Sequence, residues 1–573
     1  MRIRVLPCIA SVIVGVAIVA LAQEDKPAAD KAPVQQIGGL HFLDVSEVSV
    51  VSVDVSVTDR KGPVRGLKMA DFEVLQDGKV QPLTNFVFYQ RAVPTPTPIA
   101  TPGRAAAASP TPASPPAVQP APHFIVFYID SENILPFNRN RVLTHMTEWV
   151  LGQLHEPDQA MVVSYQRSLK ILQPFTSDPV EVSDAMRATR KYTGGANDPV
   201  NTRRQIEEYI DQHKDDSDQD TAKTNAIDQA KMFAREQRNN LTFTVGAIRE
   251  LVTMMSGLPG KKSLIYISDG LPMTPGQELF YEIQDSFHDP GSITQATEFD
   301  STDLFRGLVA SAASAGVTLY AIDSRGLESG TGIEAENRAP RSSIGAAIGQ
   351  SNYQNSLQYF TEATGGFAVL NANDPTKGLE KIAEDLETYY SLGYRYTPTG
   401  KDIYHRLAVK MKGRSDVTLN YRRSFIEKSL PTRVGDRVMS GLAFELNDNP
   451  LGIEIQIGEP TLASNDRYTL PVEIRVPLAK IALIPQGDEF YGALMVYYAA
   501  RDDEAKQSDL QRTEHPVRIP AAQYESAKKE TFVVTAQLLL EPGRYTISVG
   551  VRDELTNQAG YSRTRKPVHP EKK

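Results

Sequence analysis

Apolar residues along the chain follow two patterns, which predict two kinds of architecture. Four runs are almost wholly apolar, as is typical of strands buried on both faces of a parallel sheet. They cover residues 124–129, 161–165, 263–268 and 317–322. Apolar residues at helical spacing predict helices between them, over 139–154, 178–190, 302–314, 353–363 and 376–390. This alternation predicts an α/β domain over 123–395 with a doubly wound, mostly parallel, Rossmann-like sheet.

The segments on either side of this domain alternate between apolar and polar residues, which predicts strands with one buried face. Residues 44–91 predict a small β module, and residues 435–567 predict a C-terminal immunoglobulin-like β-sandwich. The first module is too short for a stable domain. Strands within 396–425 would complete it if the α/β domain is inserted between the two segments. The alternative is two separate β pieces.

The first 122 residues contain two segments that do not predict globular structure. Arg2 and Arg4 precede an apolar run over 9–21, and Ala20-Leu21-Ala22 fits a signal cleavage site, so residues 1–22 predict a signal peptide. Residues 23–43 then form a leader. The alternative is a retained N-terminal anchor. Residues 92–122 are mostly Pro, Ala, Thr and Ser, which predicts an extended linker. No membrane span is expected after cleavage.

Charge and cysteine content exclude several classes of protein. The net charge of −9 becomes −11 when Arg2 and Arg4 leave with the signal peptide. A chain this acidic is not expected to bind nucleic acid through its phosphates. The single cysteine, Cys8, is also lost. The mature protein therefore has no disulfide, no thiol nucleophile and no cysteine-ligated zinc.

Two strands of the predicted sheet end in aspartate, at Asp130 and Asp269. Ligands of open α/β sheets bind beyond the carboxyl ends of the strands. Two carboxylates side by side there would repel each other, and a hard cation such as Mg²⁺ or Ca²⁺ relieves the repulsion. The alternative is that each aspartate only caps the turn or helix after its strand.

The α/β region resembles a von Willebrand factor A domain, whose metal-ion-dependent adhesion site has an Asp-x-Ser-x-Ser loop, a threonine and a later aspartate. Asp130 and Asp269 match this pattern. Glu132 and Ile134 replace the two serines, and Ala196 replaces the threonine. The resemblance therefore implies a degenerate site, with a weak or absent metal held by the two aspartates. The rim expected to bind a ligand comprises Asp130, Ser131, Glu132, Asn133, Gly194, Gly195, Asn197 and Asp269.

The arrangement over 44–425 is similar to the VWFA-related domain family described from Acidobacteria. The motifs that carry this similarity are Val57-Thr58-Asp59, Asp71-Phe72-x-Val74, Asp77-Gly78, Pro259-Gly260-Lys261-Lys262-Ser263 and Tyr389-Tyr390-x-Leu392-Gly393-Tyr394. This resemblance implies a bacterial protein and is informative mainly about the fold. The signal peptide predicts export to the periplasm or the cell exterior, and the von Willebrand factor A-like rim leads us to expect a protein partner.

No catalytic motif accompanies this fold. The sequence lacks a His-Glu-x-x-His pair, a Gly-x-Ser-x-Gly elbow, a Walker loop and a Gly-x-Gly-x-x-Gly turn after a strand. We therefore expect a non-catalytic adhesion-type protein. The alternatives are a structural scaffold of an envelope assembly and a secreted hydrolase with an unrecognised site.

Overall fold

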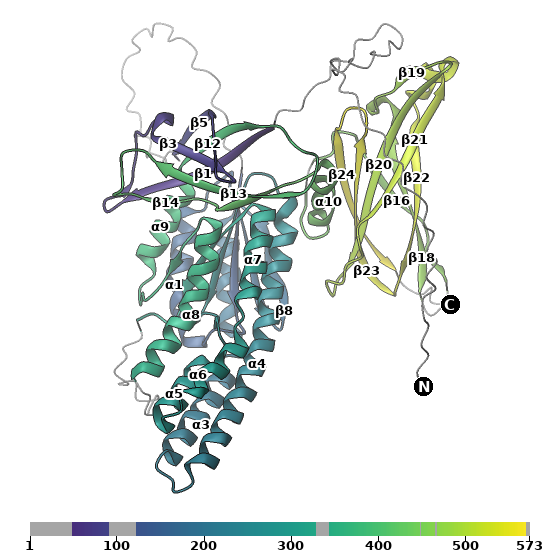
Figure 1. The fold of residues 1–573 in the computed structure, drawn as a ribbon. Coiled ribbons are helices and arrows are strands. Elements are labelled where there is room, and N and C mark those ends of the chain that lie inside the picture. The colour runs from purple at the N-terminus through teal and green to yellow at the C-terminus, as the bar shows by residue number, and fades with distance from the viewer. Residues whose placement is uncertain (1–48, 91–121, 328–342, 447, 464–466, 569–573) are drawn as a thin grey trace, which may run out of the picture. The chain divides into compact units, whose positions relative to one another are not determined.

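The computed structural model describes residues 49–90, 122–327, 343–446, 448–463 and 467–568 (Figure 1). The predicted signal peptide, the leader and nearly all of the linker lie outside these residues. Within the described part of the chain, no helix is long and apolar enough to cross a membrane.

Strands from two distant segments of the chain form one β-sandwich. One sheet has the order β14-β1-β12-β5, with β2 beside β1, and the other has the order β15-β13-β3-β4. The strands are β1 (Ser49–Asp59), β2 (Gly62–Pro63), β3 (Phe72–Gln76), β4 (Lys79–Gln81), β5 (Leu83–Gln90), β12 (Thr388–Tyr396), β13 (Ile403–Met411), β14 (Thr418–Asn420) and β15 (Ser424–Glu427). A short helical turn, η1 (Met69–Asp71), precedes β3. Strand β12 lies in this sandwich, although the sequence pattern placed the α/β domain as far as residue 395.

The pairing of these strands joins residues more than 300 positions apart. Val53 of β1 lies opposite Leu392 of β12, and Val74 of β3 lies opposite Val409 of β13. All four side chains are buried in one cluster between the sheets. Burial of this shared apolar face is what holds the two segments together.

Six strands form the sheet of the α/β region, in the order β11-β10-β9-β6-β7-β8. Neighbouring strands from β11 to β7 are parallel, and β8 pairs antiparallel with β7 at one edge. The strands are β6 (His123–Asp130), β7 (Gln159–Gln166), β8 (Ser168–Thr176), β9 (Lys261–Ser268), β10 (Val317–Asp323) and β11 (Ala368–Val369).

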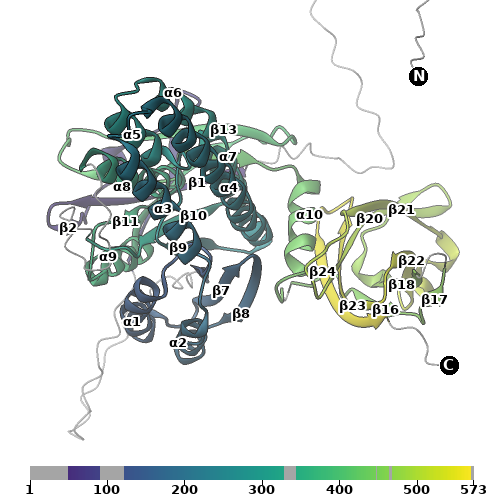
Figure 2. The same cartoon turned by 90° about the horizontal axis from the view of Figure 1, so that it is seen from below.

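Helices cover both faces of this sheet (Figure 2). Successive residues of β6 face opposite sides of the sheet. Val126 packs in the cluster with α4, α7 and α8, whereas Phe127 packs in the cluster with α1, α2 and α9. The helices are α1 (Pro136–Gln153), α2 (Pro179–Ala188), α4 (Gln219–Met254), α7 (Thr302–Ala315), α8 (Ser343–Thr364) and α9 (Thr376–Glu387), with short turns η2 (Thr189–Lys191) and η3 (Met255–Gly257).

The long helix α4 continues beyond the sheet and packs there with α3 (Asn197–His213), α5 (Gln277–Phe287), α6 (Gly291–Ala296) and η4 (Thr297–Phe299). Asp218 starts α4 because its side chain accepts a hydrogen bond from the Thr221 N–H at 3.2 Å. The five elements bury their own small apolar cluster, which includes Ile210, Phe233 and Phe280. This segment therefore has a separate core, beside which two acidic residues, Glu207 and Glu278, are buried near Arg203.

The chain after β15 forms helix α10 (Leu430–Gly441) and then a second sandwich. Its sheets have the orders β16-β18-β17, with β22 beside β18, and β19-β20-β23-β24, with β21 beside β20. The strands are β16 (Glu454–Ile457), β17 (Thr461–Leu462), β18 (Tyr468–Pro477), β19 (Ile484–Gln486), β20 (Glu489–Asp502), β21 (Gln511–Pro520), β22 (Thr531–Leu540), β23 (Gly543–Asp553) and β24 (Ala559–Val568). Short helical turns η5 (Leu478–Lys480), η6 (Ala521–Gln523) and α11 (Tyr524–Ala527) connect them.

Candidate functional site

Asp130 and Asp269 lie at the carboxyl ends of two adjacent parallel strands. Asp130 is the last residue of β6, Asp269 follows the last residue of β9, and Ile129 lies opposite Ile267 in the pairing register. Asn133 connects the two: its side-chain amide donates to Asp130 at 3.0 Å, and its carbonyl oxygen accepts from the Asp269 N–H at 3.0 Å. The structure therefore brings both predicted acids to one edge of the sheet.

The carboxylate of Asp130 is fully buried and surrounded by donors from the chain itself. One oxygen accepts from the backbone N–H groups of Glu132 and Asn133 at 3.2 and 3.1 Å. The other accepts from the Asn133 amide and the Tyr266 hydroxyl. Burial raises the pKa of Asp130 to about 6, although these hydrogen bonds act in the opposite direction. Asp130 thus organises the turn after β6.

Asp269 has a similar set of partners on the neighbouring loops. Its carboxylate accepts from the Leu135 N–H at 2.8 Å, the Asn138 amide at 3.1 Å and the Ser324 hydroxyl at 2.6 Å. Burial raises its pKa to about 6, and the hydrogen bonds again oppose this shift. Asp269 therefore ties the start of α1 and the loop after β10 to the end of β9.

The predicted glycine loop packs directly on the loop after β6. A Cβ atom on Gly194 would lie 2.6 Å from the Ser131 carbonyl oxygen, and a Cβ atom on Gly195 would lie 2.4 Å from a Glu132 carboxylate oxygen. Gly194 also has a φ of +72°, a conformation that L side chains rarely adopt. Only glycine fits at position 194, because the loop meets backbone atoms of Ser131 and Ile134 there, whereas at Gly195 the neighbouring atoms belong to the movable end of the Glu132 side chain.

Not every predicted rim residue presents a side chain to a ligand. Ser131 is completely buried, and its hydroxyl pairs with that of Ser164 at 2.9 Å. Glu132 is partly exposed and lies 4.0 Å from Arg167. Asn197 is exposed and begins α3. Among the described residues, no hydrogen bond or ion pair joins Asn197 to the two aspartates.

The residues at this site do not fit a metal ion. Each aspartate oxygen accepts hydrogen bonds from N–H or O–H groups, and the Asn133 amide donates to both Asp130 and Thr244. Donor groups therefore face the space that a cation would need, and Ile134 is buried in the core. Across the ranges that the structure describes, no group of three or more His, Cys, Asp or Glu side chains could hold a metal.

Sequence reasoning missed several residues that hold this site together. Tyr266 lies inside β9, where its apolar neighbours give no indication of a polar contact. Ser324 directly follows β10 and occupies the same strand-end position as the two aspartates. The rule that placed the aspartates at the rim could have identified Ser324. Asn138 lies in the first turn of α1, and no pattern in the sequence points to it.

Two large apolar side chains are exposed at this edge. Phe137, in the first turn of α1, is 75% exposed, and Leu327, after β10, is 61% exposed. Arg141 joins the two segments that carry them. Its guanidinium lies 5.8 Å from the Phe137 ring and donates to the carbonyl oxygens of Ser324 and Arg325 at 2.6 and 2.8 Å. We call Phe137, Arg141 and Leu327 the rim patch.

A serine–histidine contact exists elsewhere, but it has no access to substrate. His123 lies 3.0 Å from the Ser263 hydroxyl, and both side chains are buried where β6 and β9 begin. The pair lies at the opposite end of the strands from the two aspartates. A buried pair of this kind satisfies two polar side chains within the core.

The structure thus defines an α/β domain with a mostly parallel sheet, joined in sequence to two β-sandwiches. No known family model matches the chain, and no curated protein matches its sequence.

Solved structures with some similarity come from bacterial proteins. A von Willebrand factor type A protein from Catenulispora acidiphila is 7% identical, with 78% of this chain and 65% of that chain covered and a TM-score of 0.20. The pilus adhesin SpaC from Lactobacillus rhamnosus GG is 8% identical, with 87% and 69% covered and a TM-score of 0.24. The protein BatB from Bacteroides thetaiotaomicron is 11% identical, with 46% and 98% covered and a TM-score of 0.21. Scores this low carry no argument about function, so the geometry of the site has to supply it.

Proposed function

We propose that this chain is an exported, non-catalytic protein that binds a protein partner through the rim of a doubly wound, von Willebrand factor A-like domain. The adhesion site is degenerate, and binding does not need a metal. Export places the protein in the periplasm or outside the cell. The domain spanning residues 123–387 is an insertion in the sandwich built from residues 49–90 and 388–427.

The observation that supports this function best is the rim patch. Phe137 and Leu327 expose large apolar side chains beside a cluster whose polar groups are already satisfied. Aromatic residues and arginine are enriched among the residues that contribute most to protein binding. Asp269 and Arg141 tie the start of α1 to the loop after β10, and fixing these two backbone segments reduces the entropy lost when a partner binds.

The two aspartates have a structural role in this proposal. A metal-dependent site would leave carboxylate oxygens available to a cation, whereas these oxygens are used within the chain. The rim is therefore assembled before any ligand arrives. Chelation of divalent cations should leave partner binding unchanged.

Capture experiments with envelope extract test this proposal. Wild-type protein should retain the same partner with and without EDTA. Phe137→Ser combined with Leu327→Ser should lose it, because each anchor is expected to contribute about 2 kcal/mol, or roughly a thirtyfold change in affinity. Met232→Ser is the matched control, since Met232 is 69% exposed on α4 outside the rim. Equal capture by the rim variant, or loss of the partner in EDTA, would contradict the proposal.

A structural scaffold is the second candidate, and the packing of α10 favours it. The Ser440 hydroxyl of α10 donates to the Met254 carbonyl and accepts from the Gly257 N–H at 2.8 Å. A Cβ atom on Gly257 would lie 2.6 Å from Cα of Arg437. Such close contact suits a protein that links envelope components. In that case, capture would survive the rim substitutions and fail when the second sandwich is blocked by an antibody.

A further inference from the structure

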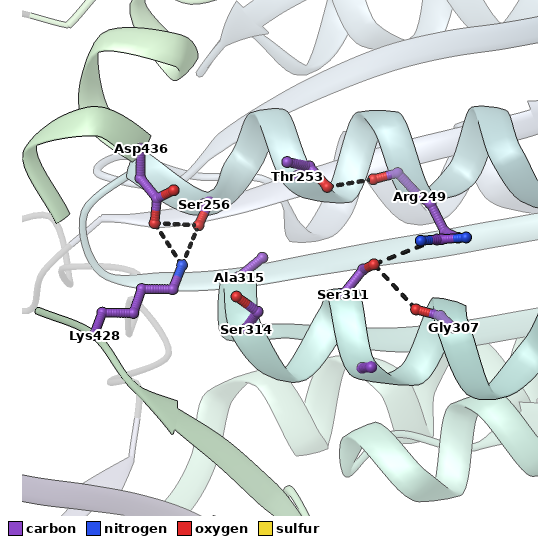
Figure 3. A pocket seen from close by; sticks show the side chains of 10 residues that line it. Arg249, Thr253, Ser256, Gly307, Ser311, Ser314, Ala315, Lys428 and Asp436 are labelled. Atoms are coloured by element: carbon purple, nitrogen blue, oxygen red, sulfur yellow. Dashed lines mark hydrogen bonds and ion pairs between the residues drawn. The ribbon is translucent and has the colours of Figure 1, made fainter. Parts of the chain in front are cut away.

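A cavity of about 320 Å³ lies between helices α4 and α7, close to where the chain leaves β15 for α10. Arg249 and Thr253 of α4 form one wall, together with Ser256 of η3, and small residues of α7 form the other (Figure 3). Lys428 and Asp436 close one end. This volume is near the lower limit for pockets that hold small organic ligands.

The cavity contains donor groups that the protein itself does not fully use. The guanidinium of Arg249 makes one long contact, from Nε to the Ser311 hydroxyl at 3.4 Å. Within the described part of the chain, its two terminal nitrogens donate no hydrogen bond, and neither does the Ser314 hydroxyl. Lys428 uses two donors, to Ser256 at 2.7 Å and to Asp436 at 2.5 Å, and so retains a third.

Positive charge exceeds negative charge around this cavity. Asp436 is shared between Lys428 and the Ser256 hydroxyl, and no other lining residue is acidic. Lys262 lies just behind, where its ammonium donates to the carbonyl oxygens of Ser256 and Leu258 at 3.4 and 3.2 Å.

The pKa of Lys262 records this excess charge. Burial and, to a smaller extent, the charges of Lys428, Arg422 and Arg437 together lower it to about 8, whereas Asp436 acts in the opposite direction. At Lys262 the repulsion from these three cations exceeds the attraction of Asp436, and Arg437 is itself paired with Asp448 at 3.3 Å. An anion in the cavity would offset that repulsion.

We propose that this cavity binds a tetrahedral dianion, either free phosphate or sulfate or the phosphate group of a small ester. Arg249 and Lys428 supply the charge from opposite ends, and Ser314 supplies a hydroxyl donor. The planar fork of Arg249 is suited to two oxygens of such an anion. The missing side chain at Gly307 leaves room for the Arg249 guanidinium, since a Cβ atom there would lie 3.3 Å from one of its terminal nitrogens, and Ala310 adds only a methyl group to the wall.

Isothermal titration of the full chain with sulfate, inorganic phosphate and glycerol 3-phosphate tests this site. We expect a dissociation constant of about 1 mM or lower for at least one of these anions. Tighter binding of glycerol 3-phosphate than of phosphate would identify an ester, whereas equal affinity would identify the free anion. No binding heat from any of the three would overturn the proposal.

Substitution of single arginines tests where the anion binds. Arg249→Gln should weaken it roughly tenfold or more, since it removes the charge from an exposed position without disturbing the core. Arg235→Gln, at an exposed position on the same helix, is the control and should bind like wild type. Equal binding by the two variants would refute the assignment.

Proton uptake provides an independent readout. Sulfate does not titrate near neutral pH, so any uptake on binding comes from the protein. Near pH 8 a bound dianion should raise the pKa of Lys262 and draw protons from the buffer. The binding heat should then depend on the ionisation enthalpy of the buffer. Binding without this dependence would place the anion away from Lys262 and contradict the proposed cavity.

Discussion

Tyr266→Phe removes a single oxygen atom from the rim and tests how Asp130 is held. Tyr266 is 1% exposed, and its hydroxyl donates to the Asp130 carboxylate. The neighbouring residue Tyr128 is equally buried and lies opposite Tyr266 on β6, with the ring centroids 5.5 Å apart. Among the described residues the Tyr128 hydroxyl has no partner. Tyr128→Phe is therefore a matched control.

The expected change in the free energy of unfolding depends on the protonation state of Asp130. Its pKa is about 6, so the carboxylate is charged at about pH 8 and mostly neutral at about pH 5. A hydrogen bond to a charged group contributes about 1.5–3 kcal/mol, and one between neutral groups about 1 kcal/mol. Tyr266→Phe should therefore lower the free energy of unfolding by about 2–3 kcal/mol at the higher pH and about 1 kcal/mol at the lower. Tyr128→Phe should be neutral or slightly stabilising at both, because a buried hydroxyl without a partner is unfavourable.

The chain contains one tryptophan, which makes the measurement specific to this domain. Trp149 lies on α1 and contacts Phe127 edge-on, with the ring centroids 6.1 Å apart. Its fluorescence during urea unfolding therefore reports the α/β region and not the sandwiches. If Tyr266→Phe and Tyr128→Phe have the same effect, or if the effect of Tyr266→Phe does not change with pH, the reasoning about Asp130 is wrong.

Three further results are expected. Burial raises the pKa of Asp130 and Asp269 from 3.8 to about 6, so the folded state holds these protons more tightly than the unfolded state does. The free energy of unfolding, monitored by Trp149 fluorescence, should therefore fall as pH rises from about 4 to about 6, by roughly 3 kcal/mol per carboxyl at most. EDTA should not change the unfolding midpoint, because neither carboxylate is arranged for a metal. Gly366→Ala should destabilise the domain by more than about 3 kcal/mol, since its Cβ would lie 2.1 Å from a backbone oxygen. Gly246→Ala should stabilise the domain by about 1 kcal/mol, because Gly246 lies on α4 and a Cβ atom there meets nothing within 4 Å. Circular dichroism melts of both variants check these two expectations.

Local patterns in the sequence account for much of the α/β region. The apolar runs became β6, β7, β9 and β10, because a strand buried on both faces has no polar position to alternate with. The polar, charged residues over 197–240 also predict helices with a break near residues 215–220, and the structure has α3 and α4 there, with Asp218 capping the second helix.

Helices α5, α6 and α10 were not predicted. The first two are short and pack in a separate small core, and α10 lies where the pattern favoured strands. A local signal for α10 was present, because Ser429 caps it and Pro431 stands in its first turn. The alternating residues that follow α10 obscured this signal.

The candidate site was also predicted only in part from the sequence. Asp130 and Asp269 were identified because each follows a buried strand, which is a local property. Whether β6 and β9 are neighbours depends on the whole sheet, and so does the contribution of Tyr266, Asn138 and Ser324 to the two carboxylates. The turn that Asp130 forms was one of the two alternatives in the sequence, and its hydrogen bonds were not visible there.

The sequence by itself determined which segments bury one face and which bury two, because that information lies in the spacing of neighbouring residues. Tertiary structure decided which strands pair across more than 300 residues, such as Val53 with Leu392. It also decided that the rim carboxylates are buried among hydrogen-bond donors and not open to a cation. Both outcomes depend on groups brought together from distant parts of the chain, and the free energy of burying them is set only when the chain has folded.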